Sequence, residues 1–543
     1  VAEDRYVFWL GSGISFGRVP GLKQVVAHVL EFLRVQIDPS NDTCRFKSAL
    51  DQALGLSPLS HDEWAVIDYS QPIAVWHGMD AIVGRLSNNY SRLLDVTVEG
   101  EPEDYLLWDG VNVTSTFADP AIEPDVEHLC VAMLMLEGVA SDIATANWDG
   151  LIERAVSDLN GGQPIHVVCV RQEDLRQAAL RAKIIKFHGC AVLAVHDQPN
   201  YRPFLVARQS QIHRWAAAAE NAAIVGRLID LVVTKPTLMM GLSAQDANIQ
   251  ALFAKAESTM AWPWPGDRPS YVFSGDQVGT DQKILLRNVY PTAYTAAART
   301  QINESSLIKA YAKPLLVALV LSVTCAKMRS LIEIAPGALN AGERLKLQDG
   351  VMALRNHLAK FADADRLQFV KDFADHSSRT STMFRDGSAG VAPRRYNPVT
   401  TIPVHQIAND QGVAASGMSE AAVLAGMLGI GLSQGLWTLE NVDVSNPETG
   451  SVRITTAVAI TKMLIAANGR TAVRLQQNGH LVDGDDAVLV YSSELPPTLP
   501  RSPRSAPGRT GHIGLREVSV FDLLQTAANA NDLVQKFREA AAI

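Results

Sequence analysis

Four motifs, each placed directly after an apolar run, contain the residue types that can do chemistry in this chain. They are a glycine loop, a Thr-x-Asn-x-Asp motif, a His-Gly pair and a Gly-x-Ser motif, made of Gly11, Ser12, Gly13, Ser15, Thr145, Asn147, Asp149, His188, Gly189, Gly241 and Ser243. The apolar runs before them span residues 5–10, 141–145, 183–187 and 237–240. If these runs are strands of an open parallel sheet, the motifs meet at its carboxyl edge, where such sheets bind ligands. We therefore expect one shared site.

The glycine loop has the composition of a phosphate-binding turn. Gly11 and Gly13 permit tight backbone geometry, and amide groups at the start of the helix expected over residues 21–34 favour a diphosphate. The spacing departs from the Gly-x-Gly-x-x-Gly pattern, because the third glycine, Gly17, comes one residue late. An ordinary strand-to-helix turn explains the loop equally well, and Pro20 suits the first turn of a helix under either interpretation.

The amide of Asn147 stands where an apolar strand ends. A polar amide is costly in such a place unless it has hydrogen-bonding partners, and its carboxamide can hold a ribose hydroxyl and a water together. The alternative is structural, since Asn147 or Asp149 can cap the helix expected over residues 151–159. The two interpretations are compatible if Asp149 caps the helix and Asn147 contacts a ligand.

His188 follows a predicted strand and precedes Gly189, so its ring is expected to project from the rim of the sheet. A histidine in that place can act as a general base near neutral pH. A single histidine is also commonly a packed or solvated residue, so His188 alone does not indicate catalysis. Ser243 and Asp246 have a structural alternative as well, because either can cap the helix expected over residues 248–260.

The order of the expected elements predicts an α/β fold. Strands are expected at residues 5–10, 141–145, 165–170, 183–187, 237–240 and 270–273. From residue 124 onwards they alternate with helices, which is typical of a doubly wound parallel sheet with helices on both faces. Between the first two strands, residues 41–112 have mostly helical patterns, so a large helical insertion is expected there.

Beyond residue 300 the pattern changes, and we place a domain boundary there. Residues 304–375 have helical periodicity, and further helices are expected over residues 419–432 and 520–540. Strands are expected at residues 452–464, 471–475 and 487–492. The sequence therefore predicts a first domain, residues 1–300, and a second domain, residues 301–543, that is helical and then α+β.

Composition argues against several classes of protein. The formal net charge of −9 gives no electrostatic footprint for nucleic acid, so direct nucleic-acid binding is not expected. Five scattered cysteines without a Cys-x-x-Cys pair argue against a zinc site or a disulfide framework and fit a reducing cytosol. The most apolar stretch, residues 314–326, is shorter than the about 20 residues of a membrane span. We expect a cytoplasmic protein without a membrane anchor.

Taken together and in this order, the four motifs resemble the sirtuin family. Its members carry a Gly-Ala-Gly-x-Ser loop, a Thr-x-Asn-x-Asp motif, a His-Gly motif and a Gly-x-Ser motif around NAD. The resemblance covers about residues 5–300, and residues 147–156, 184–189 and 240–249 look most like the bacterial sirtuin-like domains of antiphage defence systems. It implies a sirtuin-like variant of the Rossmann fold that binds and hydrolyses NAD.

Two departures set this sequence apart from protein deacylases. The zinc-binding cysteine quartet is missing, and Pro20, Gly21 and Leu22 stand where deacylases typically continue Pro-Asp-Phe-Arg. We therefore expect NAD as a substrate, no metal, and no groove for an acyl-lysine peptide.

The resemblance also implies a reaction and a set of roles. The expected activity is that of an NAD glycohydrolase, which cleaves the nicotinamide–ribose bond to give nicotinamide and ADP-ribose. Nicotinamide leaves as a neutral pyridine, so no general acid is needed. Asn147 would position the ribose hydroxyls and the attacking water, His188 would accept a proton, and Asp149 would orient the loop that carries Asn147. The expected NAD contacts are Gly11, Ser12, Gly13, Ser15, Pro20, Thr145, Gly241, Ser243 and Asp246.

Such an activity has to be controlled, because an NAD hydrolase that is always active would exhaust its host's cofactor. We therefore expect a gated pocket, with residues 301–543 supplying assembly or partner surfaces. The resemblance implies a homo-oligomer and, in abortive infection, a partner such as a hexameric DNA-translocase ATPase or another defence subunit. Two other functions stay open: a sensor or structural subunit that binds NAD or ADP-ribose without turnover, and an NAD-dependent protein deacylase.

Overall fold

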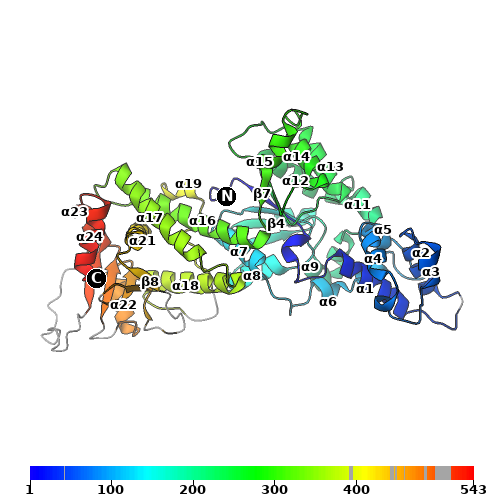
Figure 1. Ribbon diagram of the computed structural model, residues 1–543, viewed down its shortest axis with the longest axis horizontal. Coiled ribbons are helices and arrows are strands. Elements are labelled where there is room, and N and C mark those ends of the chain that lie inside the picture. The colour runs from blue at the N-terminus through cyan, green and yellow to red at the C-terminus, as the bar shows by residue number, and fades with distance from the viewer. Residues whose placement is uncertain are drawn as a thin grey trace.

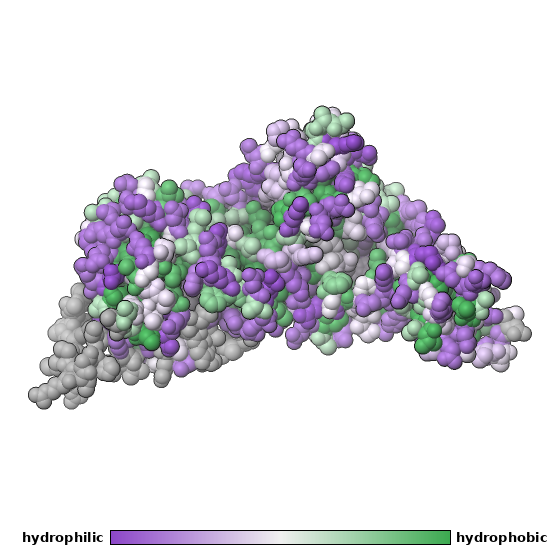
Figure 2. All heavy atoms as spheres, viewed as in Figure 1, coloured by the Kyte–Doolittle hydropathy of each residue, from purple (hydrophilic) through white to green (hydrophobic). Residues whose placement is uncertain are grey.

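The computed structural model describes residues 1–41, 43–390, 395–440, 446, 449–457, 459–481, 486–495 and 515–543. The molecule is elongated, with a parallel sheet and its helices in the middle, a helical insertion at one end and the C-terminal region at the other (Figure 1). On the face drawn in Figure 2, polar residues cover most of the surface and apolar residues form patches between them.

Seven parallel strands form the central sheet, in the order β3-β4-β2-β1-β5-β6-β7. The strands are β1 (Val7–Leu10), β2 (Asp142–Thr145), β3 (His166–Cys169), β4 (Ala182–Lys186), β5 (Thr237–Met240), β6 (Tyr271–Ser274) and β7 (Leu307–Lys309). The six expected strands and the α/β fold class are confirmed. The seventh, β7, was not expected, because its three residues lie in a stretch with helical periodicity. The sheet therefore continues past residue 300.

The strand order changes direction at β1. The strands that follow it first in the chain, β2 to β4, lie on one side of it, and β5 to β7 lie on the other. Leu10 is in register with Thr145 of β2 and with Met240 of β5, and Thr145 is in register with Lys186 of β4. These four strands therefore end at the same level, and the motifs that follow them begin at one edge. In open α/β sheets, such a reversal is where ligands bind.

The side chains of β1 are completely buried and alternate between two cores, because successive residues of a strand point to opposite faces. Phe8 and Leu10 pack on one face, and Val7 and Trp9 pack on the other. The first face is covered by α7 (Val126–Leu136) and α8 (Leu151–Asn160), and the second by α12 (Ala222–Thr234), α13 (Ala247–Glu257) and α14 (Thr280–Val289). Cover on both faces explains why the strand is apolar throughout.

The expected helical insertion is present and has a core of its own. It comprises α2 (Arg45–Gly55), α3 (His61–Ala65), α4 (Met79–Ser87), α5 (Tyr90–Leu93) and α6 (Val113–Phe117), packed against α1 (Leu22–Val35). Smaller helices complete this half of the chain: α9 (Ala191–His196), α10 (Gln198–Tyr201), α11 (Gln209–Trp215) and α15 (Arg299–Ser306).

The C-terminal region combines helices with a mixed five-stranded sheet in the order β12-β11-β10-β9-β8. The strands are β8 (Thr438–Glu440), β9 (Val452–Thr455), β10 (Ile460–Ala466), β11 (Ala487–Tyr491) and β12 (Arg516–Ser519). The helices are α16 (Ala312–Ile334), α17 (Ala341–Ala359), α18 (Arg366–Asp386), α19 (Val404–Ile407), α20 (Gln411–Ala414), α21 (Met418–Ser433), α22 (Gly469–Gln477), α23 (Val520–Thr526) and α24 (Ala530–Ala541).

Three expectations for this region are wrong. The single strand expected over residues 452–464 is two strands, β9 and β10, which pair antiparallel with each other. Residues 471–475 lie in the helix α22 and not in a strand; Asn468 caps this helix, and its buried residues Ala472 and Leu475 are spaced by three, as on a helix face. The single helix expected over residues 520–540 is two helices, because Asn529 starts a new one by accepting a hydrogen bond from Asp532 N.

α16 has 23 residues, so the helix is longer than the apolar stretch at residues 314–326 that it contains. By length and composition it could cross a membrane, but half of its apolar window is buried inside the fold. It packs against α7, α17 and α21, and the side chain of its Lys327 is completely buried. α16 is therefore part of the core of the fold.

Small residues let α21 approach α17 closely. A Cβ on Gly426 would lie 2.7 Å from the carbonyl oxygen of Leu347, and a Cβ on Gly429 would collide with the main chain of Gly350. The glycine- and alanine-rich composition of α21 therefore serves packing inside this chain.

Candidate active site

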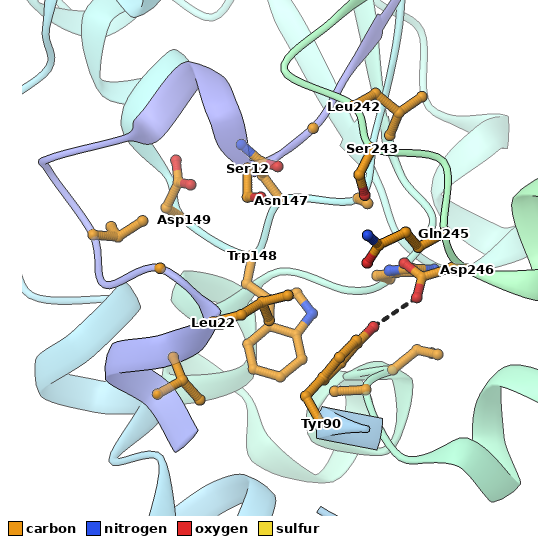
Figure 3. A pocket seen from close by; sticks show the side chains of 18 of the residues that line it. Ser12, Leu22, Tyr90, Asn147, Trp148, Asp149, Leu242, Ser243, Gln245 and Asp246 are labelled. Atoms are coloured by element: carbon orange, nitrogen blue, oxygen red, sulfur yellow. Dashed lines mark hydrogen bonds between the residues drawn. The ribbon is translucent and has the colours of Figure 1, made fainter. Parts of the chain in front are cut away.

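One cavity opens at the carboxyl edge of the central sheet, among the loops that follow β1, β2, β4 and β5 (Figure 3). Its cavity volume is about 160 Å³, and the cavity is partly open to solvent. Nine of the residues expected at the site line it: Gly11, Ser12, Pro20, Asn147, Asp149, His188, Gly241, Ser243 and Asp246. The sheet therefore brings all four motifs to one cavity.

The other three expected residues contact the lining from behind or beside it. Thr145 is fully buried, and its Oγ1 accepts a hydrogen bond from Asn147 N at 3.0 Å. Ser15 is also fully buried and bonds to Asn147 and Asp149. The N–H of Gly13 donates to the carbonyl oxygen of Gly241 at 3.0 Å. Thr145, Ser15 and Gly13 therefore hold lining residues in place through hydrogen bonds.

Glycines are required where the loop after β1 meets the loop after β5. Gly241 has φ +63°, and a Cβ on it would lie 2.7 Å from Ile14 N. A Cβ on Gly13 would lie 2.6 Å from Gly241 Cα. The amides of Gly11 and Gly13 donate to the main chain of Met240 and Gly241. These glycines therefore serve the close packing of the two loops.

Ser15 is the centre of a buried hydrogen-bond network. Its Oγ donates to Asp149 Oδ2 at 2.9 Å and accepts from Asn147 Nδ2 at 3.2 Å. It also lies 3.0 Å from His128 Nε2. His128 Nδ1 accepts the N–H of Asp125, so the ring proton is on Nε2 and points at Ser15. Burial lowers the pKa of His128, which keeps the ring neutral.

The network leaves one atom of Asn147 without a partner. Its Nδ2 is held by Ser15, whereas Oδ1 is buried and accepts no hydrogen bond. The residue is 7% exposed, on the cavity wall. An unpaired buried acceptor costs about 1–3 kcal/mol, and a hydroxyl group in the cavity would remove that cost. The residues present therefore fit a ligand that offers a hydroxyl, as a ribose does.

Asp149 serves the structural role expected of it together with an orienting one. Its Oδ1 accepts the N–H of Leu151 at 3.2 Å, at the start of α8, and its Oδ2 takes the Ser15 hydroxyl. Lys186, fully buried in β4, donates to the main-chain oxygen of Asp149 and lies 2.6 Å from Glu153. The loop that carries Asn147 is thus held from three sides.

His188 is buried, and its Nε2 lies 2.7 Å from Asn248 Nδ2. Because Asn248 Oδ1 accepts the N–H of Ile249, the amide nitrogen faces the ring and donates to it. Burial lowers the pKa of His188, against the opposing charge of Asp246. His188 is therefore neutral at neutral pH and carries its lone pair on Nε2, as a general base must.

Asp246 has a partner from the helical insertion. Tyr90 in α5 donates its hydroxyl to Asp246 Oδ1 at 2.6 Å across the cavity (Figure 3), and burial raises the pKa of the tyrosine. Trp148 also lines the cavity, and its ring contacts Phe117 at 5.4 Å between centroids. The aromatic wall of the cavity therefore combines Tyr90 and Phe117 of the insertion with Trp148 of the loop after β2.

Three polar residues of this site were missed by the sequence analysis. Asn248 and Tyr90 gave no local signal. His128 did, because Asp125 and His128 have the spacing of a capping box at the start of α7, which we did not assign. In the described part of the chain, no lysine or arginine lines the cavity and no group of three metal-ligating side chains is found.

In a comparison with known families, residues 141–289 match the model of the SIR2-like domain. A search among curated proteins found no relative that matches the chain. The matched segment runs from β2 to α14 and contains Asn147, His188 and Ser243, whereas β1 and the helical insertion lie outside it. SIR2-like domains are in general NAD-dependent enzymes, so the match indicates an NAD-related activity for this cavity.

Proposed function

We propose that this chain is an NAD glycohydrolase, which cleaves the nicotinamide–ribose bond of NAD to give nicotinamide and ADP-ribose. One observation carries the proposal: Asn147, whose buried Oδ1 has no hydrogen-bond partner, lines the same cavity as the buried, neutral His188, within the segment that matches the SIR2-like domain. The first group suits a ribose hydroxyl and the second suits removal of a proton.

Asn147 acts by holding the ribose in place. Ser15 fixes the amide nitrogen, so the carbonyl oxygen keeps one direction and accepts from a hydroxyl of the ribose that loses nicotinamide. A preorganised acceptor needs no rearrangement as charge develops at the reacting carbon, and this is where such groups contribute most to rate. The leaving group departs as a neutral base, so no side chain has to protonate it.

His188 acts as the general base. Its Nε2 lone pair is held by Asn248 in the absence of a ligand. To accept a proton from water or from a ribose hydroxyl, Nε2 exchanges the Asn248 hydrogen bond for one to the reacting group. The lowered pKa keeps the ring unprotonated, which is the form that a base needs.

Water is the acceptor that best suits this cavity. Tyr90, Trp148 and Phe117 form the wall opposite the sheet, and the tyrosine is bonded to Asp246. These bulky groups favour a small acceptor over an acyl-lysine peptide. Transfer of an acyl group from a peptide remains the alternative reaction, and it predicts that nicotinamide release depends on added peptide.

The test is product analysis with two variants and a matched control. Asn147→Ala and His188→Ala are expected to lower NAD turnover by at least about 100-fold, as removal of a catalytic donor or base does. His213→Ala, an exposed histidine in α11, is the control and keeps wild-type turnover. Chromatography of nicotinamide and ADP-ribose gives the rates. Near-normal turnover in both cavity variants contradicts the proposal, and NAD binding without any product supports the sensor instead.

We further propose that turnover is gated and serves antiphage defence by depleting NAD. The sequence resemblance supports this context, with a homo-oligomer or a translocase ATPase as partner. The expected result is low turnover alone and higher turnover in the assembly. Light scattering that finds a monomer, alone and with the neighbouring gene product, contradicts the assembly.

A further inference from the structure

Asp125 connects three elements at the edge of the cavity. It caps α7, where its Oδ1 accepts the N–H of Val126 at 2.8 Å. Its Oδ2 lies 3.1 Å from Arg18 Nε and 2.7 Å from Lys313 Nζ. Arg18 belongs to the loop of residues 16–21, and Lys313 lies in the first turn of α16. A single carboxylate oxygen thus joins that loop, α7 and the C-terminal region.

The 16–21 loop borders the cavity, because Val19, Pro20 and Gly21 are among its lining residues. Phe16 is 81% exposed, so burial of this ring does not hold the loop in place. Arg18 reaches from the loop to Asp125, and its side chain is 31% exposed. The ion pair with Asp125 therefore anchors the loop together with the buried Val19 and the hydrogen bonds that the N–H groups of Arg18 and Val19 donate to Ser15 O.

The carboxyl group of Asp125 is ionised at neutral pH. Burial pushes the pKa of Asp125 up, but the hydrogen bonds from Arg18 and Lys313 outweigh this and lower the pKa to about 2. Glu127 lies in the first turn of α7, and burial raises its pKa to about 7. At neutral pH, Asp125 therefore supplies the full negative charge that holds both cations.

We propose that Lys313 is a positioning residue for the 16–21 loop, through which the C-terminal region sets the affinity of the cavity for the ADP-ribose part of NAD. Two cations on one oxygen restrict the carboxylate to the orientation that receives Arg18. Without Lys313, Asp125 keeps its helix cap but loses one restraint, and the loop loosens. The identity of the ligand rests on the proposed function. A partner that moves the start of α16 then changes affinity.

The experiment compares three variants of the full-length chain. Lys313→Met removes the charge, Lys313→Arg restores it, and Lys346→Met is the control, because Lys346 forms an exposed ion pair with Glu343 in α17. Hydrogen exchange of residues 16–21 reports the loop, and calorimetry with ADP-ribose reports the affinity. For Lys313→Met we expect faster exchange and about three- to tenfold weaker binding, as a partly exposed pair allows. Lys313→Arg and Lys346→Met remain like wild type.

The proposal is overturned by unchanged exchange of the loop in Lys313→Met or by the same change in Lys346→Met. An affinity that stays unchanged while the loop loosens also overturns it. A failure of the proposed function looks different, because the wild-type protein then does not bind ADP-ribose at all, while the exchange of residues 16–21 still responds to Lys313.

Discussion

An ion pair ties α7 to α16 at each end of α7, and the two pairs differ in their surroundings. At the C-terminal end, Lys327 Nζ lies 2.6 Å from Glu137 Oε2, and the side chains are 0% and 1% exposed. Tyr396 also donates to this carboxylate. At the N-terminal end, next to the cavity, Lys313 is 41% exposed. It shares the carboxylate of Asp125 with the side chain of Arg18.

The two pairs are expected to contribute differently to stability and to geometry. Breaking a fully buried pair leaves an uncompensated charge in the interior, which is strongly destabilising. An exposed pair contributes little to stability but can still select one geometry. We therefore expect the position of α7 to be fixed more firmly at the end away from the cavity than at the end beside it. The end beside the cavity carries His128 and, through Asp125, contacts the 16–21 loop.

The largest expected effect comes from breaking the buried pair. Lys327→Met should lower the free energy of unfolding by about 3–5 kcal/mol, because Glu137 then stays buried without its cation. Lys313→Met should cost less than about 1 kcal/mol, as partly exposed pairs do. Urea unfolding of both variants measures the difference. Equal losses would show that the two ends of α7 are held alike.

The next effect concerns the network at the cavity end. Ser15→Ala leaves Asn147 Nδ2 and His128 Nε2 without their acceptor, so the amide loses its fixed direction. We expect NAD turnover to fall about 10- to 100-fold, by analogy with the loss of a catalytic hydrogen bond. The matched control is Ser87→Ala, which removes a buried hydroxyl bonded to Val83 O in α4. It should reduce stability alone; equal turnover in both variants contradicts the role of Ser15.

A smaller effect appears with pH. Because burial lowers the pKa of His188 below 6.5 in the folded state, the unfolded chain binds more protons between that lowered pKa and 6.5. This histidine therefore reduces stability as the pH falls through that window, by up to about 1.4 kcal/mol per pH unit. Urea unfolding between pH 7 and pH 5 should show a smaller decrease in His188→Gln than in the wild type. Identical slopes would mean that His188 is not buried as a neutral base.

The smallest effect tests the aromatic wall. Tyr90→Phe removes the hydroxyl that Asp246 accepts, at a cost of about 1–2 kcal/mol for a hydrogen bond to a charged group. Asp246 becomes free for a ribose hydroxyl, so the KM for NAD should change by a few-fold while kcat stays within about twofold. Steady-state kinetics separates the two. A large loss of kcat would place Tyr90 in the chemistry itself.

Local pattern was enough to predict the central sheet. Each strand that ends in a motif is an apolar run bounded by small or polar residues, and the register of Leu10, Thr145 and Met240 brings those motifs to one edge. The helix capped by Asp149 and the insertion between the first two strands were predicted for the same reason. The strand β7 was not, because three residues do not establish a period.

Contacts between distant segments could not be predicted in this way. Tyr90 meets Asp246 across 156 residues of chain, and Ser15 meets His128 across 113. Neither contact corresponds to a periodic pattern in the sequence, because only the packing of the insertion and of α7 on the sheet brings the side chains together. The close approach of Gly11 and Gly13 to Gly241 could not be predicted for a related reason, because Gly241 follows another strand.

The position of β1 has a consequence for how the chain is made. This strand is central in the sheet, yet its neighbours β2 and β5 begin only at residues 142 and 237. At ordinary ribosomal speeds, β1 therefore waits roughly 10–50 s for its second neighbour. Contacts of such long range slow folding. Until β2 has been synthesised the apolar strand has no sheet to join, and until β5 follows its other edge stays unpaired. Nascent chains of this protein should therefore depend on chaperones over that interval.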